Sequence, residues 1–395
     1  MSAVPDSDAP GADRYLDAAA TAPLRREARD AMLAALDAGP GNASSVHTAG
    51  HRARTAVEAA RSGIASALGA SPGELVLTSG GTEANNLAIT GLALANPRGR
   101  HLVTTPLEHP SVIESCRYLE RVFGFDLTLL AVDERGRVDP SSLEGALRPD
   151  TTLVSVGLAN AEVGTVQPLP DIAAVAKNRG ALVHTDAVQA AASLPVSFGE
   201  GGSGWPGTAV DAMTIASHKF GGPQGAGALL LRAGTRIEPL LHGGGQERGL
   251  RSGTENVAAI AGFAAAVGAH AGDAGTRALE LVRSRDELIA RVLAEVAGAS
   301  LTGHPEERLP GHASFVVEGQ SGESLLVALD AAGFAVSSGS ACAAGKDEPS
   351  PALLAMGFAP DLARTAIRFT LANPLGPGAL ERIVGVLRSE IHAHR

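Results

Sequence analysis

The chain has 395 residues, of which 45% are hydrophobic and 19% charged, and its formal net charge is −10. A chain of this length folds around a large buried core in two or three domains, and its acidic balance argues against nucleic acid as a direct partner. The two cysteines, Cys116 and Cys342, are too few and too far apart for a disulfide framework or a zinc site. We therefore expect a reducing, cytoplasmic location and no bound metal.

The N-terminal residues are acidic and include proline and glycine, so we expect residues 1–14 to be a disordered leader, not a signal peptide. No stretch has the roughly 18 uninterrupted apolar residues of a spanning helix, so we expect no membrane partner. Two helical patterns follow, at residues 23–36 and 46–68, separated by the glycine-containing loop 39–45.

Seven short apolar runs then alternate, for the most part, with helix-length segments. Strands of this continuous apolar character belong to a sheet that is covered on both faces, and they predict an α/β fold with a seven-stranded, mostly parallel sheet flanked by helices. Such a sheet binds its ligand outside the carboxyl ends of its strands. The runs lie at residues 75–78, 102–104, 127–132, 153–156, 181–185, 212–216 and 228–231.

Beyond residue 253 the pattern is helical, first to about residue 272 and then over 276–296. The last hundred residues predict a smaller α+β unit, with strands at 313–317 and 366–371 and helices at 323–332 and 379–392. We predict a large domain over 15–265, whose first residues pack on the small domain, and a small domain over 266–395. The stretches 199–207 and 339–351 are expected to be mobile loops.

Lys219 follows the apolar run 212–216 and precedes a turn that contains five glycines and prolines, Gly221, Gly222, Pro223, Gly225 and Gly227. A lysine at the end of a buried strand, beside glycines that let a flat ligand approach, is suited to form a Schiff base. The alternative is a solvent-facing lysine in a hairpin, which the sequence around Lys219 does not exclude by itself.

The strand at 75–78 runs into Ser79-Gly80-Gly81-Thr82-Glu83. Unpaired backbone N–H groups at such a helix start bind phosphate, and the hydroxyl of Thr82 adds another donor. A plain helix cap with an acidic first turn explains the same residues about as well.

Asp186 stands at the carboxyl end of the run 181–185, and it precedes Lys219 by 33 residues. Neighbouring strands could therefore present both groups to one ligand, where a carboxylate can keep a pyridinium nitrogen protonated. Without Lys219, a helix-capping role for Asp186 would be preferred.

Three further residues are candidates for chemistry. His109 follows a strand and opens a helix at Pro110, where an imidazole can lie against an aromatic cofactor and move protons. Cys342 lies in a small, polar, glycine-flanked loop and can offer a thiolate, whereas Cys116 lies in a helical pattern and is expected to be buried and inert. Arg368 interrupts an apolar strand and either pairs within the core or binds a substrate carboxylate.

The order of these motifs resembles the cysteine desulfurases of the class V aminotransferase-like enzymes, over nearly the whole chain from Tyr15. The loop Ser338-Gly339-Ser340-Ala341-Cys342 resembles the NifS and IscS branch. The resemblance implies pyridoxal phosphate (PLP) as cofactor, the PLP fold type I, and conversion of L-cysteine to L-alanine with a persulfide on Cys342. It also implies a homodimer and a protein sulfur acceptor, either an iron–sulfur scaffold or a thiolation enzyme.

The same resemblance assigns residue roles. It implies that PLP is joined to Lys219, that Asp186 meets its ring nitrogen, and that Gln189 lies near its phenolic oxygen. The phosphate would be held by Gly81, Thr82, Ser217 and His218, with Thr254 reaching it from the other subunit. His109 would stack on the ring, and Asn42 and Arg368 would bind the substrate.

The sequence departs from this family in two places. Ala161 in Asn160-Ala161-Glu162 stands where a second asparagine commonly contacts the phenolic oxygen, and the segment 199–207 looks like an insertion. The rivals are other reactions on the same cofactor, namely selenocysteine lyase or another class V lyase or aminotransferase. A cofactor-free scaffold is the rival of a different class, and the presence of Lys219 and Asp186 argues against it.

Overall fold

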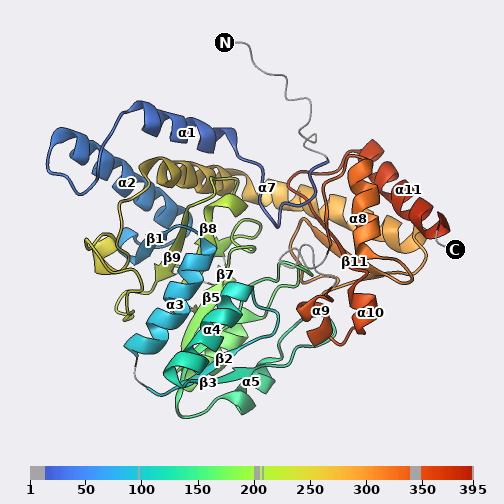
Figure 1. Ribbon diagram of the computed structural model, residues 1–395, viewed down its shortest axis with the longest axis horizontal. Coiled ribbons are helices and arrows are strands. Elements are labelled where there is room, and N and C mark those ends of the chain that lie inside the picture. The colour runs from blue at the N-terminus through green and yellow to red at the C-terminus, as the bar shows by residue number, and fades with distance from the viewer. Residues whose placement is uncertain (1–13, 97, 200–204, 207–208, 339–347, 394–395) are drawn as a thin grey trace.

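The structure, a computed structural model, describes residues 14–96, 98–199, 205–206, 209–338 and 348–393. Figure 1 shows two units side by side, a larger one built around a wide sheet and a smaller one that contains the C-terminus. One long helix, α7 (Val257–Glu295), runs from the large unit into the small one.

The large sheet has seven strands in the order β1-β9-β8-β5-β4-β2-β3. Within this sheet β9 runs antiparallel to both of its neighbours, β1 and β8. The other pairs of neighbouring strands in the sheet are parallel. The predicted fold class is therefore confirmed. The strands are β1 (Leu75–Thr78), β2 (His101–Thr104), β3 (Asp126–Leu129), β4 (Thr151–Ser155), β5 (Leu182–Asp186), β8 (Ala212–Ala216) and β9 (Gly227–Leu231).

Both faces of this sheet are buried, which is why its strands are apolar throughout. In β1 the side chains of Leu75 and Leu77 belong to the core shared with α2 (Thr48–Ala67) and α6 (Leu169–Asn178). Val76 points the other way, into the core formed with α3 (Gly81–Ala95) and α4 (Pro110–Phe123). This alternation follows from the period of two residues in a strand.

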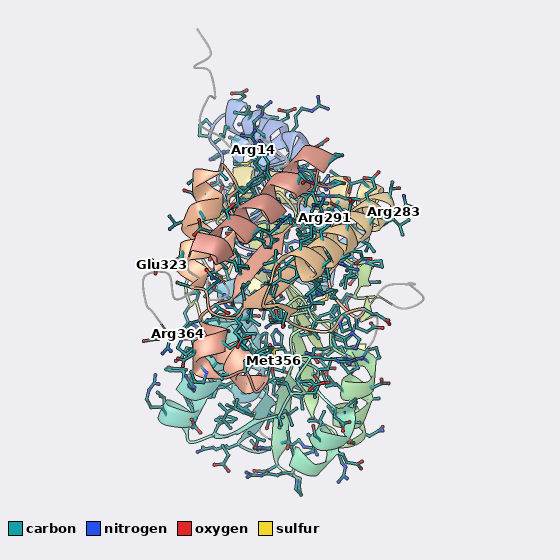
Figure 2. All side chains as sticks on the ribbon, turned by 90° about the vertical axis from the view of Figure 1, so that its right-hand side faces the viewer. Arg14, Arg283, Arg291, Glu323, Met356 and Arg364 are labelled. Carbon is teal, nitrogen blue, oxygen red and sulfur yellow. The ribbon has the colours of Figure 1, made fainter. Side chains whose placement is uncertain are left out.

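The small unit is an antiparallel sheet in the order β10-β11-β13-β12, backed by helices. Its strands β11 (His312–Val317) and β13 (Ile367–Thr370) were predicted, whereas β10 (Ala299–Leu301) and β12 (Ser337–Ser338) are too short to show a pattern. Its core joins the C-terminal half of α7 to α8 (Gly322–Ala331) and α11 (Pro377–Ala393). Figure 2 views this end, with Arg283 and Arg291 of α7 labelled.

The predicted break between residues 272 and 276 is wrong, because α7 is continuous across it. Glycine costs about 1 kcal/mol in a helix interior, and packing offsets that cost: α1 (Arg26–Asp37) and α2 cover the first half of α7, and the small sheet covers the second. By length and composition α7 would also pass as a membrane span, which the sequence expectation overlooked. Here its apolar residues, Phe263 and Leu288 among them, lie in the cores of the two units.

The N-terminal segment links the two units. Leu16 is buried in the small core, and the backbone at Asp17 bridges to Thr370 of β13. The chain then enters the large unit, where the N–H of Ala22 donates to the carbonyl of His218. The division at residue 265 stays a prediction, since α7 crosses it without a change of structure.

Shorter elements complete the described chain. Within the predicted insertion, residues 205–206 form a short strand that pairs with residues 196–197, and residues 200–204 and 207 lie outside the described ones. These elements are α5 (Pro140–Ala146), α9 (Pro351–Ala355), α10 (Pro360–Ala363), β6 (Val196–Ser197), β7 (Trp205–Pro206) and the 3-10 turns Pro72–Glu74, Ser217–Lys219 and Glu247–Gly249.

Candidate active site

A cavity of about 420 Å³ opens at the carboxyl ends of the parallel strands, beside the small unit. This is where a parallel sheet is expected to bind its ligand. Eight of the predicted site residues line it, which the sequence places far apart: Gly81, Thr82, His109, Asp186, Gln189, His218, Lys219 and Arg368.

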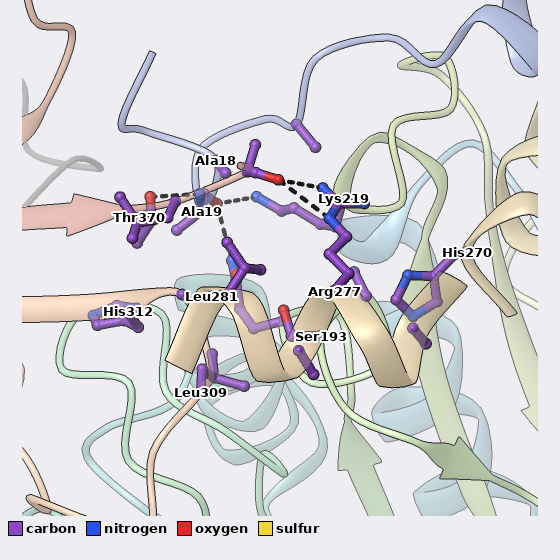
Figure 3. A pocket seen from close by; sticks show the side chains of 18 residues that line it. Ala18, Ala19, Ser193, Lys219, His270, Arg277, Leu281, Leu309, His312 and Thr370 are labelled. Atoms are coloured by element: carbon purple, nitrogen blue, oxygen red, sulfur yellow. Dashed lines mark hydrogen bonds between the residues drawn. The ribbon is translucent and has the colours of Figure 1, made fainter. Parts of the chain in front are cut away.

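Lys219 ends a 3-10 turn directly after β8, so its position is set by a buried strand. Its Nζ donates to the carbonyls of Ala19 and, at 2.8 Å, Ala20. Figure 3 shows Lys219 extended towards this N-terminal segment, with Thr370 of β13 beyond it; the N–H of Ala19 donates to Thr370 Oγ1 at 2.9 Å. The amine thus lies where the two units meet. A second cavity, of about 60 Å³, adjoins the first at Lys219.

Asp186 ends β5, the strand next to β8, with Asp186 opposite Thr214 in the register. Its Oδ1 accepts the N–H of Val188 at 2.9 Å, and its Oδ2 accepts Asn85 Nδ2 at 2.7 Å. These donors orient the carboxylate at the cavity wall. The expectation that neighbouring strands carry Asp186 and Lys219 to one cavity is confirmed.

His109 caps α4, whose first residue is Pro110. Its Nδ1 accepts the backbone N–H of Ser111 at 3.1 Å and lies 2.7 Å from Ser111 Oγ. Loss of hydration lowers the pKa of His109, Asp186 opposes this by raising it, and Lys219 lowers it further. The ring is therefore neutral at physiological pH.

The predicted phosphate site contains two buried polar atoms. Ser217 Oγ and His218 Nδ1 are buried, and neither finds a hydrogen-bond partner among the residues described. Burial, reinforced by Lys219, lowers the pKa of His218 to about 4, so the ring is neutral. Gly81 and Thr82 at the start of α3 add unpaired backbone N–H groups at the cavity. Buried polar atoms of this kind are costly unless a ligand or water satisfies them.

Arg368 is 3% exposed and lies on β13 at the edge of the cavity. Its guanidinium donates to Asp17 Oδ1 at 2.7 Å and to the carbonyl of Ala161 at 3.1 Å. Its Nε is buried without a partner within the described part of the chain. The side chain is therefore paired with Asp17 within the core and also lines the cavity.

The departure at Ala161 is not compensated by its neighbour. Asn160 Oδ1 accepts the N–H groups of Glu162 and Val163, at 2.7 and 2.8 Å, while its Nδ2 donates to the carbonyl of Leu107. Its amide is occupied in holding the turn. The methyl group of Ala161 itself offers no donor to the cavity.

Glu108 was not predicted, although it directly precedes His109 and lines the same cavity. Its carboxyl group accepts Thr105 Oγ1 at 2.8 Å and the N–H of Gly157 at 2.9 Å. Burial, with a contribution from the charge of Asp186, raises its pKa to about 7. A charged residue between two buried or capping positions was the only sequence signal.

The remaining predicted residues lie elsewhere. Asn42 and Thr254 are exposed and do not line this cavity, so this chain does not bring them to its own site. Cys342 lies outside the described residues. Cys116 is 1% exposed, and burial raises its pKa to about 12, which agrees with an inert thiol. Among the described side chains no cluster of three or more His, Cys, Asp and Glu could hold a metal ion.

The residues fit pyridoxal phosphate. An amine follows one strand, a carboxylate ends the next, a neutral histidine caps a nearby helix, and orphaned donors surround a helix start. These groups match the aldehyde, ring nitrogen, ring face and phosphate of that cofactor. Fold and site together define a PLP-dependent enzyme.

The chain belongs to the class V aminotransferase family, whose sequence profile matches residues 14–374. It is 44% identical to the cysteine desulfurase IscS of Dictyoglomus turgidum over 358 residues, which cover 90% of this chain and 89% of the relative. A solved NifS-like protein superposes with a TM-score of 0.87 at 33% identity, covering 96% of this chain and 99% of its own. A structure of SspA in complex with cysteine gives a TM-score of 0.77 at 31% identity, covering 91% and 99%. The predicted family and cofactor are confirmed.

Proposed function

We propose that this protein is a cysteine desulfurase, which converts L-cysteine to L-alanine and transfers the sulfur to Cys342 as a persulfide. The observation that carries the proposal is the convergence of Lys219, Asp186, His109 and Arg368 on one cavity. Its support is the similarity, along nearly the whole chain, to relatives that bear this activity in their names.

The contacts of the cavity residues support the proposed cofactor-binding roles. Asp186, oriented by Asn85 and the N–H of Val188, would face the ring nitrogen, and His109 would lie against the ring. Gly81, Thr82, Ser217 and His218 would satisfy the phosphate. When bound, the cofactor accepts electrons from the substrate's Cα, which makes the α-proton acidic.

We propose that Gln189 contacts the phenolic oxygen of the cofactor. It lines the cavity, and its Nε2 donates to the carbonyl of Ala19 at 2.9 Å. We propose that Thr254 of the partner subunit completes the phosphate site and that Asn42 contributes to substrate binding across the interface of a homodimer. Both positions are exposed in the single chain.

The substrate is held and deprotonated by residues of this chain. Arg368, whose side chain lines the cavity, would bind the carboxylate of L-cysteine through its guanidinium group. Lys219, once released from the cofactor, would remove the α-proton. The carbonyls of Ala19 and Ala20 would position its amine, because they accept from Nζ in the structure.

The sulfur atom would pass from L-cysteine to Cys342. The thiolate of Cys342 attacks the sulfur atom of L-cysteine; an S–S bond forms and the C–S bond breaks. The electron pair of the broken bond stays with the three-carbon product, which takes up a proton and leaves as L-alanine. The sulfur remains on Cys342 as a persulfide, so one L-cysteine and one thiol give one L-alanine and one persulfide.

The described residues on either side of the Cys342 stretch neighbour residues that line the cavity. Ser337 of β12 is opposite Arg368 in the sheet register, and Ser350 Oγ donates to Glu162 Oε2 at 2.5 Å. Both Arg368 and Glu162 line the cavity. Cys342 is four residues from Ser338, and an extended chain covers about 3.5 Å per residue, so its Cα is at most about 14 Å away from that anchor.

We further propose a cytoplasmic location, which two distant cysteines favour, and a protein acceptor for the persulfide sulfur, either an iron–sulfur scaffold or a thiolation enzyme. The acidic net charge supports a protein acceptor over direct contact with nucleic acid.

The test compares Cys342→Ala with Cys116→Ala, the matched control. Cys342→Ala should still bind L-cysteine and exchange its α-proton with solvent deuterium, but should form no protein persulfide and release little alanine. Cys116→Ala should keep the parent activity, because its buried thiol is inert. If Cys342→Ala makes alanine and sulfide at the parent rate, the persulfide route is refuted and a β-eliminating or selenium-specific lyase is the better assignment.

A further inference from the structure

Asn85 and Ser111 connect Asp186 to His109 in a chain of hydrogen bonds across the base of the cavity. Asn85 lies in α3 and is 1% exposed; Ser111 lies in the first turn of α4 and is 8% exposed. Asn85 Nδ2 is 2.7 Å from Asp186 Oδ2 and 2.9 Å from Ser111 Oγ, which is 2.7 Å from His109 Nδ1. Three elements, β5, α3 and α4, therefore meet through side chains that sequence analysis did not single out.

Asp186 determines which atom donates in each of these hydrogen bonds. Both carboxyl oxygens of Asp186 accept, one from the N–H of Val188 and one from Asn85 Nδ2, so the Asn85 amide turns its NH₂ group, not its oxygen, towards Asp186. The two hydrogens of that group then go to Asp186 and to Ser111. Because the Ser111 hydroxyl accepts from Asn85, its own hydrogen is directed to His109 Nδ1.

His109 Nδ1 consequently faces two donors, the hydroxyl and the backbone N–H of Ser111. A nitrogen that accepts two hydrogen bonds carries no proton, and in a neutral imidazole the proton is then on the other nitrogen. Protonation at Nδ1 would set it against the Ser111 N–H, which cannot turn away.

We propose that Asn85 and Ser111 are positioning residues that hold His109 as a neutral imidazole with its proton on Nε2. The ring then enters the reaction as a hydrogen-bond donor towards the cavity and is a poor proton acceptor, which leaves proton abstraction to Lys219. This inference rests on the proposed function for its role in catalysis, but the tautomer itself is a property of the folded chain.

The charged and titratable groups around the ring agree with this state. Glu108 precedes His109, and Asp186 and Lys219 line the same cavity. The positive charge of Lys219 disfavours protonation of His109, and the charge of Asp186 favours it. The carboxyl group of Asp186 also accepts hydrogen bonds from Asn85 and from the N–H of Val188.

The test reads the ring nitrogens directly by ¹⁵N NMR of full-length, ¹⁵N-histidine-labelled protein, with and without PLP. The signal of His109 is assigned from its loss in His109→Gln. In the parent, we expect Nδ1 unprotonated and Nε2 protonated at neutral pH, with the imidazolium appearing only at a lower pH than for an ordinary histidine. A protonated Nδ1 in the parent would overturn the proposal without the need for any variant.

Three variants test the hydrogen bonds that link Asp186 to His109 through Asn85 and Ser111. Ser111→Ala removes the hydroxyl, so the tautomer ratio should fall by about two- to tenfold, the value of one net hydrogen bond, and the imidazolium should appear as the pH is lowered. Ser111→Thr keeps a hydroxyl and should restore the parent spectrum. Ser115→Ala, the matched control one turn further along α4, removes a buried hydroxyl that donates to the Ser111 carbonyl and should leave His109 unchanged.

An unchanged His109 spectrum in Ser111→Ala would refute the proposed role of Ser111 in holding the tautomer of His109. Failure of the proposed activity has a different signature, because the spectrum of the cofactor-free protein does not depend on turnover. In the active enzyme, we also expect Ser111→Ala to add an acidic limb to the pH profile of kcat, at the pH where His109 becomes protonated. Ser111→Thr should remove this limb again.

Discussion

Replacing Glu108 by glutamine should stabilise the protein at neutral and alkaline pH. Glu108 accepts hydrogen bonds from Thr105 Oγ1 and the N–H of Gly157, and burial raises its pKa to about 7. Glutamine can keep the bond from Gly157 through its oxygen and turn its NH₂ group towards Thr105 Oγ1. The substitution therefore removes the charge and preserves the shape.

The magnitude follows from linkage. In the unfolded chain Glu108 loses its proton at its ordinary pKa of 4.5, whereas the folded protein retains it to about pH 7. Ionisation therefore favours unfolding, and the free energy of unfolding falls as pH rises from 4.5 to 7 and is level above that. One pKa unit corresponds to about 1.4 kcal/mol, so the whole window is worth about 3 kcal/mol and the part between pH 5 and pH 8 about 2 to 3 kcal/mol.

The assay is urea unfolding of the full-length, cofactor-free protein at a series of pH values, for the parent and Glu108→Gln. The difference in the free energy of unfolding between the two should grow by about 2 to 3 kcal/mol from pH 5 to pH 8. Glu134→Gln, at an exposed position, serves as the control for an unspecific change of charge. Parallel curves for the parent and Glu108→Gln would show that Glu108 is ionised at pH 5 and that its burial is offset by other contacts.

Three further outcomes are expected. Lys219→Ala should abolish turnover, and mass spectrometry after borohydride reduction should find the cofactor on the Lys219 peptide of the parent and on no peptide of the variant; retained activity would refute the assignment. Arg368→Lys should raise KM for L-cysteine by about ten- to a hundredfold with a smaller effect on kcat, because lysine keeps the charge but loses the planar fork that binds a carboxylate. An unchanged KM would place Arg368 in the core pair with Asp17 only. Ala161→Asn adds one donor, worth about 1 kcal/mol, and should move the pH midpoint of the cofactor's visible absorption by roughly one unit at most; because the Asn160 amide is occupied, no movement would mean that water supplies the bond.

The groups that act on the cofactor were accessible from the sequence because their signals are local. A buried strand needs only four or five consecutive apolar residues to be recognised, and a parallel sheet places the residue after each strand at one edge. Asp186 and Lys219, which are 33 residues apart, could thus be assigned to one site from the sequence alone. His109 was found in the same way, since Pro110 indicates the start of a helix.

Tertiary structure alone decided which side chains support these groups. Asn85 and Ser111 belong to different helices, and only the packing of α3 and α4 against the sheet brings them to Asp186 and His109. The carbonyls of Ala19 and Ala20 reach Lys219 from 199 or more residues away. Such contacts carry no periodic or compositional signal.

The continuity of α7 was also decided by packing. Its glycine-containing middle predicts a break, since local propensity favours one there. The two units pack on opposite halves of the helix and together make the unbroken form more stable. Sequence thus determined the elements and the reactive groups at their ends, because backbone propensity and burial patterns are local; the network that sets their protonation states depends on long-range contacts, which only the folded chain provides.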